Sequence, residues 1–206
     1  MKTILKFLTS VVLAAAIVLV VAPHYEHRLR GEISLYPKPY SETVRRAILK
    51  SSHWANDREI LSLVNRAEKK YGSQIDQISK KYYADPKDIK AIAIVESSID
   101  EAAKSSEGAI GLMGVKRTTG AAMGFTDVEH PIKNLSAGTK YYQTLLKRFK
   151  DRELALAAYN LGPGKVEDRL SSGFDPETME YIWKIRRVVH IINRSESQRR
   201  FDQHGA

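Results

Sequence analysis

The sequence predicts an all-α protein, and three observations support this fold class. The pairs Asp85-Pro86 and Asp175-Pro176 each place a preferred N-cap residue before a proline, which suits the first position of a helix. The segments after these pairs carry apolar residues at the spacing of a buried helix face. Alternation of apolar and polar residues, which is typical of strands, is nearly absent after residue 60.

The first 22 residues have the pattern of an export signal. Lys2 and Lys6 precede an apolar run that extends from Phe7 to Ala22. Counted from Ile4, the run approaches the length that spans a bilayer. Pro23 follows the best cleavage position, where proline usually blocks processing. We therefore expect residues 1–22 to remain as a membrane-anchoring helix, and a cleaved signal peptide is the alternative.

The rest of the chain divides into a linker, a helical extension, one domain and a tail. Residues 23–40 contain three prolines and no periodicity, and they are predicted to be a linker. Residues 41–71 form the predicted N-terminal helical extension, and residues 72–194 the predicted domain. Residues 195–206 are polar and arginine-rich, and this tail is expected to fray.

Individual helices follow from caps and apolar periodicity. The expected helices are Ser41 to about Lys50, Asp57–Tyr71, Ser73 to about Tyr83, Pro86 to about Ser98, Asn134–Phe149, Arg152–Asn160, Lys165–Leu170 and one that starts at Pro176. Residues 99–133 hold several glycines and are expected to be irregular, with one short helix near Thr118–Met123. An irregular segment of this length inside a compact domain is usually functional.

The composition limits the partners and the chemistry. The chain of 206 residues has a net charge of +9 and a pI near 9.6, which indicates an anionic partner such as nucleic acid, anionic lipid or an acidic polymer. No zinc-finger, P-loop or RNP signature is present, so nucleic acid is not expected. The chain has no cysteine, and its six histidines lack metal-binding spacing. We expect no metal and no cofactor.

Glu96 is the strongest candidate for chemistry. It lies on the apolar stripe of its predicted helix, together with Ile89 and Ile92, and close to the helix C-terminus. Burial disfavours the charged carboxylate, and the carbonyl groups at that end of a helix repel it. Both effects raise the pKa of a carboxyl group, so that Glu96 could donate a proton near neutral pH.

Four ordered motifs between about residues 72 and 190 resemble the catalytic domain of lytic transglycosylases of the soluble-lytic-transglycosylase (SLT) type. They are Glu96-Ser97, Ser105-x-x-Gly108-Ala109-x-Gly111-Leu112-Met113, Ala158-Tyr159-Asn160-x-Gly162-Pro163-Gly164 and Glu177-Thr178-x-x-Tyr181. The resemblance implies a mostly helical, lysozyme-like fold. It also implies cleavage of the β-1,4 bond between N-acetylmuramic acid and N-acetylglucosamine in peptidoglycan glycan strands. The muramyl C6 hydroxyl would attack in place of water and leave a 1,6-anhydromuramyl end.

The resemblance also implies roles for single residues. Glu96 matches the single catalytic acid/base of the family, and Ser97 the serine that follows it. Ser105 matches an active-site serine near the substrate, and Met113 belongs to the motif that shapes the wall of the cleft.

The last two motifs imply supporting roles. Tyr159 and Asn160 match a pair beside the glutamate, and the family's tyrosine hydroxyl lies within hydrogen-bonding reach of it. Glu177 and Tyr181 match a motif whose expected role is mainly structural.

The chain departs from the family pattern at two places. Gly114 and Arg117 stand where the family usually has glutamine and proline, and Ile99-Asp100-Glu101 replaces the usual Phe-Asn-Pro. The missing glutamine removes a side chain that is expected to hydrogen-bond sugar. Three functions therefore remain open: a lytic transglycosylase, a lysozyme-like hydrolase that uses water, and a weakly active or inactive peptidoglycan-binding module. Together with the N-terminal segment, they predict a bacterial cell-envelope protein, anchored in the inner membrane with a periplasmic domain or exported after signal cleavage.

Overall fold

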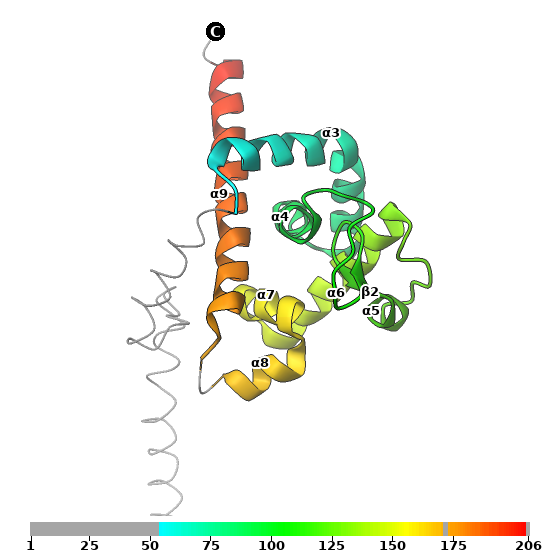
Figure 1. Cartoon of the computed structure of the whole chain (residues 1–206). Helices are drawn as coiled ribbons and strands as arrows, with labels where there is room; N and C mark the ends of the chain where they lie inside the picture. Colours follow the sequence, from blue (N-terminus) through cyan, green and yellow to red (C-terminus); the bar gives the residue numbers. More distant parts are fainter. Residues whose placement is uncertain (1–53, 171–172, 205–206) are drawn as a thin grey trace, which may run out of the picture. The chain divides into compact units, whose positions relative to one another are not determined.

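The structure is a computed structural model that describes residues 54–170 and 173–204. The described residues belong to one compact unit, residues 42–206. Its elements are α3 (Asp57–Tyr82), α4 (Pro86–Ser97), β1 (Ala109–Ile110), β2 (Val115–Lys116), α5 (Arg117–Ala122), α6 (Pro131–Phe149), α7 (Arg152–Leu161), α8 (Pro163–Arg169) and α9 (Pro176–His204). The prediction of a mostly helical domain is confirmed (Figure 1).

Three of the expected N-terminal features lie outside the described residues: the membrane anchor (1–22), the linker (23–40) and the helix from Ser41 to Lys50. Among the described residues, no helix is both long and apolar enough to cross a membrane.

Helix α3 is one continuous helix, so the expectation of two helices that part between Tyr71 and Ser73 is wrong. Its start is fixed by a capping box, in which Asn56 and Glu59 satisfy each other's backbone N–H groups. Tyr71, Ile75 and Ile78 are buried along the helix, and this shared burial outweighs the roughly 1 kcal/mol that a glycine costs inside a helix. The helix instead bends along its length (Figure 1), and Gly-Ser pairs such as Gly72-Ser73 are typical positions for a bend.

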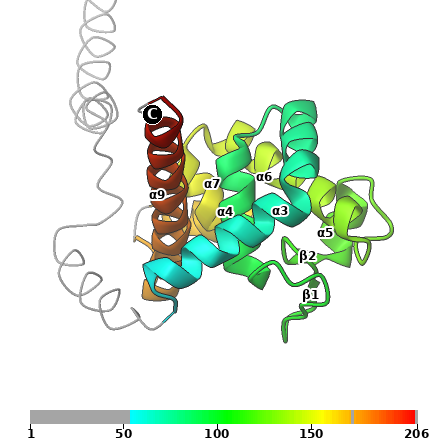
Figure 2. The ribbon, with the colours of Figure 1, turned by 90° about the horizontal axis from the view of Figure 1, so that it is seen from above.

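Helix α4 carries Glu96 and lies between α3 and α9 (Figures 1 and 2). Asp85 caps its start by accepting a hydrogen bond of 2.9 Å from the N–H of Lys87, and Pro86 occupies the first turn. Ser98 ends it in the left-handed conformation. Start and end both agree with the sequence prediction. Ile89 and Ile92 are fully buried, so packing holds this helix in place from several sides.

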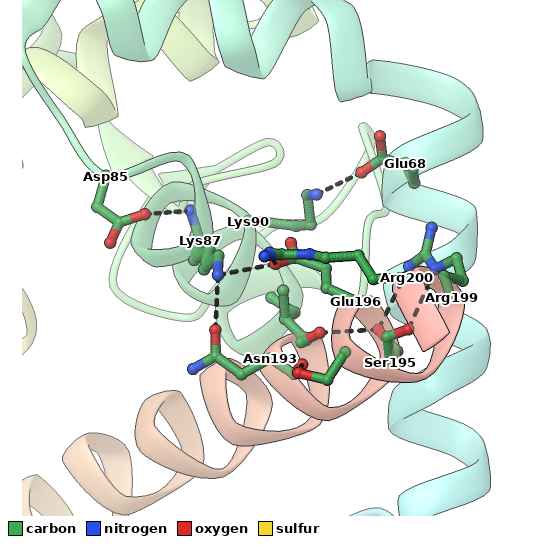
Figure 3. A network of polar contacts seen from close by, with 11 residues as sticks. Glu68, Asp85, Lys87, Lys90, Asn193, Ser195, Glu196, Arg199 and Arg200 are labelled. Atoms are coloured by element: carbon green, nitrogen blue, oxygen red, sulfur yellow. Dashed lines mark hydrogen bonds and ion pairs between the residues drawn. The ribbon is translucent and has the colours of Figure 1, made fainter. Parts of the chain in front are cut away.

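Two lysines tie the start of α4 to its neighbours (Figure 3). The Lys87 ammonium group donates to Oδ1 of Asn193 at 2.6 Å and pairs with Glu196 at 2.8 Å, and both of these partners lie on α9. Lys90 pairs with Glu68 on α3. Because α9 continues as a helix through Glu196 to His204, the expectation that the tail frays from Ser195 is wrong.

The segment from 99 to 133 contains the short helix α5, as expected, and also an antiparallel hairpin. In this hairpin, Ala109 pairs with Lys116 and Ile110 with Val115. The next helix, α6, begins at Pro131 with His130 as its N-cap, so the expectation that Asn134 caps it is wrong. Asn134 is instead fully buried within α6, where its side chain binds the loops around the hairpin.

Candidate active site

Glu96 lies in the last turn of α4, where the residue is half-buried. Burial raises the pKa of this carboxyl to about 7, while a hydrogen bond from Tyr181 acts in the opposite direction and lowers it. A carboxyl group with a pKa near 7 exists in both protonation states at neutral pH. The direction of this shift is the one that the sequence analysis expects for a carboxyl group that exchanges a proton near neutral pH.

Tyr181 holds the carboxyl group of Glu96 from α9. Its hydroxyl donates a hydrogen bond of 2.8 Å to Oε1 of Glu96, and only 7% of the residue is exposed. Burial raises the pKa of the Tyr181 hydroxyl well above 10, so it remains a donor at physiological pH. The expectation of a mainly structural role missed this contact. One signal was present, because a tyrosine on an apolar helix face needs a partner for its hydroxyl.

Tyr159 does not contact Glu96 in the expected way. Its hydroxyl donates to the backbone carbonyl of Met113 at 2.8 Å, and in the described structure no hydrogen bond joins it to Glu96. The charge of Glu96 nevertheless contributes to the raised pKa of Tyr159, so the two groups are close. Tyr159 thus supports the site by holding the segment between β1 and β2.

Gly114, between β1 and β2, lies against the second oxygen of Glu96. Its φ of +57° is a left-handed conformation that glycine adopts without strain. A methyl group in place of its hydrogen would lie 2.5 Å from Oε2 of Glu96. The carboxyl group is therefore held between Tyr181 on one side and the Gly114 backbone on the other.

Asn134 fixes the hairpin that carries Met113 and Gly114, and sequence reasoning missed this role. Its amide nitrogen donates to the carbonyls of Ile110 and Val128, both at 2.8 Å, and its amide oxygen accepts from the N–H of Met113 at 2.8 Å. These three bonds satisfy most of the amide's capacity in a fully buried position. The side chain thereby joins α6 to β1, to the turn next to Glu96 and to the loop that precedes α6.

The remaining predicted site residues differ in their placement. The Ser97 hydroxyl lies 2.9 Å from the carbonyl of Leu112 and 3.0 Å from that of Ala93, so it joins α4 to the hairpin. Ser105 is exposed, and its hydroxyl accepts a hydrogen bond of 3.0 Å from the N–H of Ala109. Asn160 is exposed at the end of α7. In the described residues, no hydrogen bond links Ser105 or Asn160 to Glu96.

The chain is similar in sequence to known transglycosylases. It is 32% identical over 119 residues to membrane-bound lytic murein transglycosylase F of Cellvibrio japonicus, a match that covers 52% of this chain and 23% of the relative. It is 26% identical over 118 residues to the transglycosylase of Enterobacteria phage PRD1, which covers 57% of this chain and 42% of the phage protein. The chain thus spans about a quarter of the Cellvibrio relative and less than half of the phage relative.

A solved structure shares the fold. The X-ray structure of an inactive mutant of lytic transglycosylase Slt from Pseudomonas aeruginosa aligns with a TM-score of 0.55 at 20% identity, and it covers 78% of this chain and 34% of that one. Residues 73–182, more than half of the chain, match the family described as the Transglycosylase SLT domain. This range includes Glu96, Met113, Asn134, Tyr159 and Tyr181, and the chain belongs to the Transglycosylase SLT domain family.

Proposed function

We propose that the protein is a peptidoglycan lytic transglycosylase in which Glu96 is the single general acid/base. The observation that carries the proposal is the environment of Glu96: burial raises its pKa to about 7 and Tyr181 orients it. Relatives named lytic murein transglycosylase support the substrate class.

The reaction needs one carboxyl group that both gives and takes a proton. Glu96 would protonate the glycosidic oxygen that leaves, while the N-acetyl oxygen of the substrate stabilises the sugar as an oxazolinium-like intermediate. Glu96, then ionised, would remove the proton from the muramyl C6 hydroxyl, whose oxygen closes the 1,6-anhydro ring. A pKa near 7 suits both steps because neither protonation state is strongly favoured.

A hydrolase that uses two carboxylates requires a second acid roughly 5–9.5 Å from the first. The sequence shows no second acid in a motif comparable to that of Glu96. This favours a mechanism in which the substrate itself supplies the nucleophile.

Product analysis tests the proposal. The full chain should convert purified peptidoglycan to muropeptides with 1,6-anhydromuramyl ends, which mass spectrometry distinguishes from reducing ends by the loss of one water. Products with only reducing ends would instead identify a hydrolase that uses water. No soluble product, together with retention on insoluble peptidoglycan, would identify a binding module.

We also propose that the protein is held in the inner membrane by residues 1–22, with its catalytic domain in the periplasm. Support comes from the apolar run before Pro23 and from relatives that are named membrane-bound. Cell fractionation tests this: the full-length protein should sediment with membranes and be digested by protease added to spheroplasts. A shortened form in the periplasmic fraction would contradict the anchor and leave the proposed enzyme activity intact.

A further inference from the structure

We propose that Gly114 is a positioning residue of the active site, because its lack of a side chain allows the Glu96 carboxyl group to lie against the hairpin and meet Tyr181. The inference rests on the proposed function, in which Glu96 is the acid/base. It gives a role to the position where the chain departs from the usual family pattern.

Even the smallest side chain at position 114 would require the Glu96 side chain to move. A methyl group there would lie 2.5 Å from Oε2, 3.1 Å from Cδ and 3.5 Å from Cβ of Glu96. Favourable contacts between heavy atoms begin at roughly 3.5 Å. The two nearest contacts involve the carboxyl group itself, so a side chain at position 114 competes with the present position of that group.

Glu96 cannot move as a whole to relieve this contact. Its helix is anchored by Ala93 and Ile94, which are 1% and 0% exposed, and Ser97 bonds to the hairpin carbonyl of Leu112 at 2.9 Å. The side chain of Glu96 would therefore have to rotate. Oε1 accepts the hydrogen bond from Tyr181, and Oε2 is the oxygen nearest Gly114. A rotation of the carboxyl group therefore disturbs both the hydrogen bond and the contact with Gly114.

Such a rotation should change how strongly Glu96 holds its proton. Among the described residues, the titratable groups on which the charge of Glu96 acts are the hydroxyls of Tyr181 on α9 and Tyr159 on α7, and both have a pKa well above 10. Burial is the larger influence on the Glu96 pKa, and the Tyr181 bond the smaller, opposing one. Displacement toward solvent therefore lowers the pKa of Glu96 from about 7 toward its ordinary value of 4.5.

Gly124 offers a matched control. It has a φ of +83°, so an alanine there meets the same kind of left-handed strain as one at Gly114. A methyl group on Gly124 would have its nearest neighbour, the Lys140 ammonium nitrogen, at 4.0 Å. Gly124→Ala therefore tests backbone strain without a contact to Glu96.

The experiment compares Gly114→Ala and Gly124→Ala in the full chain. Steady-state rates of muropeptide release should show a kcat that falls by tenfold to a hundredfold in Gly114→Ala, with KM changed by less than about threefold because substrate contacts remain. Carbon-13 NMR titration of the Glu96 carboxyl, assigned by its absence in Glu96→Gln, should show a pKa at least one unit lower. Gly124→Ala should change neither quantity. An unchanged Glu96 pKa in Gly114→Ala, or equal effects in both variants, would overturn the proposal.

Two further readouts keep the test independent of activity and of folding. The NMR titration applies even if the protein releases no muropeptides, an outcome that contradicts the proposed function alone. Denaturant unfolding of Gly114→Ala should show a lower midpoint than the wild type, and adding Glu96→Ala should recover most of that loss, because the two nearest contact atoms are then gone. If Gly114→Ala does not fold but the double variant does, the proposal holds. If Glu96→Ala alone folds, but the double variant has an unfolding midpoint no higher than that of Gly114→Ala, the glycine is needed only for its backbone conformation. In that case the proposal fails.

Discussion

The hydroxyl of Tyr181 and the carboxyl of Glu96 lie 2.8 Å apart although 85 positions separate them in the sequence. This hydrogen bond joins the last turn of α4 to α9, two helices that also share the Lys87 contacts at the other end of α4. The position of the candidate acid therefore depends on how α9 packs against α4. Tyr181 becomes the most informative second residue to change.

Tyr181→Phe should reduce the rate of muropeptide release by about tenfold, because a buried hydrogen bond of this kind stabilises by roughly 1–3 kcal/mol. The Tyr181 bond lowers the pKa of Glu96, so its loss should raise that pKa above about 7. Since Glu96 must be protonated to act as an acid, the alkaline limb of the pH–rate profile should move to higher pH. Measurement of kcat/KM between pH 5 and 9 checks both effects.

A matched control for this variant is Tyr142→Phe. The hydroxyl of Tyr142 also donates to a carboxylate in the core, at 2.9 Å from Oδ2 of Asp88. Tyr142→Phe should therefore destabilise the fold by a similar amount and leave the pH–rate profile in place. A shifted profile in Tyr142→Phe, or an unshifted one in Tyr181→Phe, would argue against a direct role of the Tyr181 bond.

Tyr159→Phe should act mainly on stability. Its hydroxyl bonds to the carbonyl of Met113, and loss of this donor should lower the free energy of unfolding by about 1–2 kcal/mol. The rate should fall less than in Tyr181→Phe, since the hydrogen bond to Glu96 is retained. Denaturant unfolding and steady-state kinetics of the same samples measure the two effects. A larger loss of rate than in Tyr181→Phe would show that Tyr159 contacts substrate or Glu96 during the reaction.

The sequence predicted those features that are determined locally. The start of α4 follows from Asp85 and Pro86, and the burial of Glu96 follows from the apolar face on which it lies. The Tyr181 contact depends on how α9 packs against α4, and no local pattern encodes that packing. Asn134 looked like a helix cap because caps and buried amides use the same residue types. Its buried role depends on the backbone groups around it, which make three hydrogen bonds with its side chain. Two of these groups lie in the hairpin, which is distant in sequence from α6.

Asn134→Ala should be among the most destabilising single changes in the domain. It leaves two carbonyls and one N–H without their partner in a buried region, and each such loss costs about 1–3 kcal/mol. We expect the free energy of unfolding to fall by at least about 3 kcal/mol, as measured by urea denaturation. Asn160→Ala is the control: its side chain is exposed, so the change should stay within about 0.5 kcal/mol. Equal free energies of unfolding of the two variants would contradict the role of Asn134 in holding the hairpin against α6.

Glu96→Gln should abolish most activity and preserve binding. Glutamine keeps the shape and can still accept a hydrogen bond from Tyr181, but it cannot deliver a proton. General acid–base catalysis contributes a factor of roughly 10²–10⁴ to the rate. The rate of muropeptide release should therefore fall by at least about 10². Sedimentation with insoluble peptidoglycan should be unchanged. A variant with normal activity would rule out Glu96 as the acid/base.

The same variant should also change how stability depends on pH. The folded-state pKa of Glu96, about 7, lies above the ordinary value of 4.5 that applies in the unfolded chain. The folded protein therefore holds this proton more tightly. The resulting stabilisation is complete below pH 4.5 and is lost as the pH rises through 7. A shift of this size corresponds to about 3 kcal/mol.

Urea denaturation of the wild type and of Glu96→Gln at pH 4.5, 6 and 8 measures this contribution. All other carboxyl groups titrate alike in the two proteins, so the difference between their free energies of unfolding isolates Glu96. Relative to Glu96→Gln, the wild type should lose about 2–3 kcal/mol between pH 4.5 and pH 8, because ionisation then has to occur in the buried site. A difference that stays constant over this range would mean that the Glu96 carboxyl is solvated in the folded protein, and it would remove the physical basis for its role as a proton donor at neutral pH.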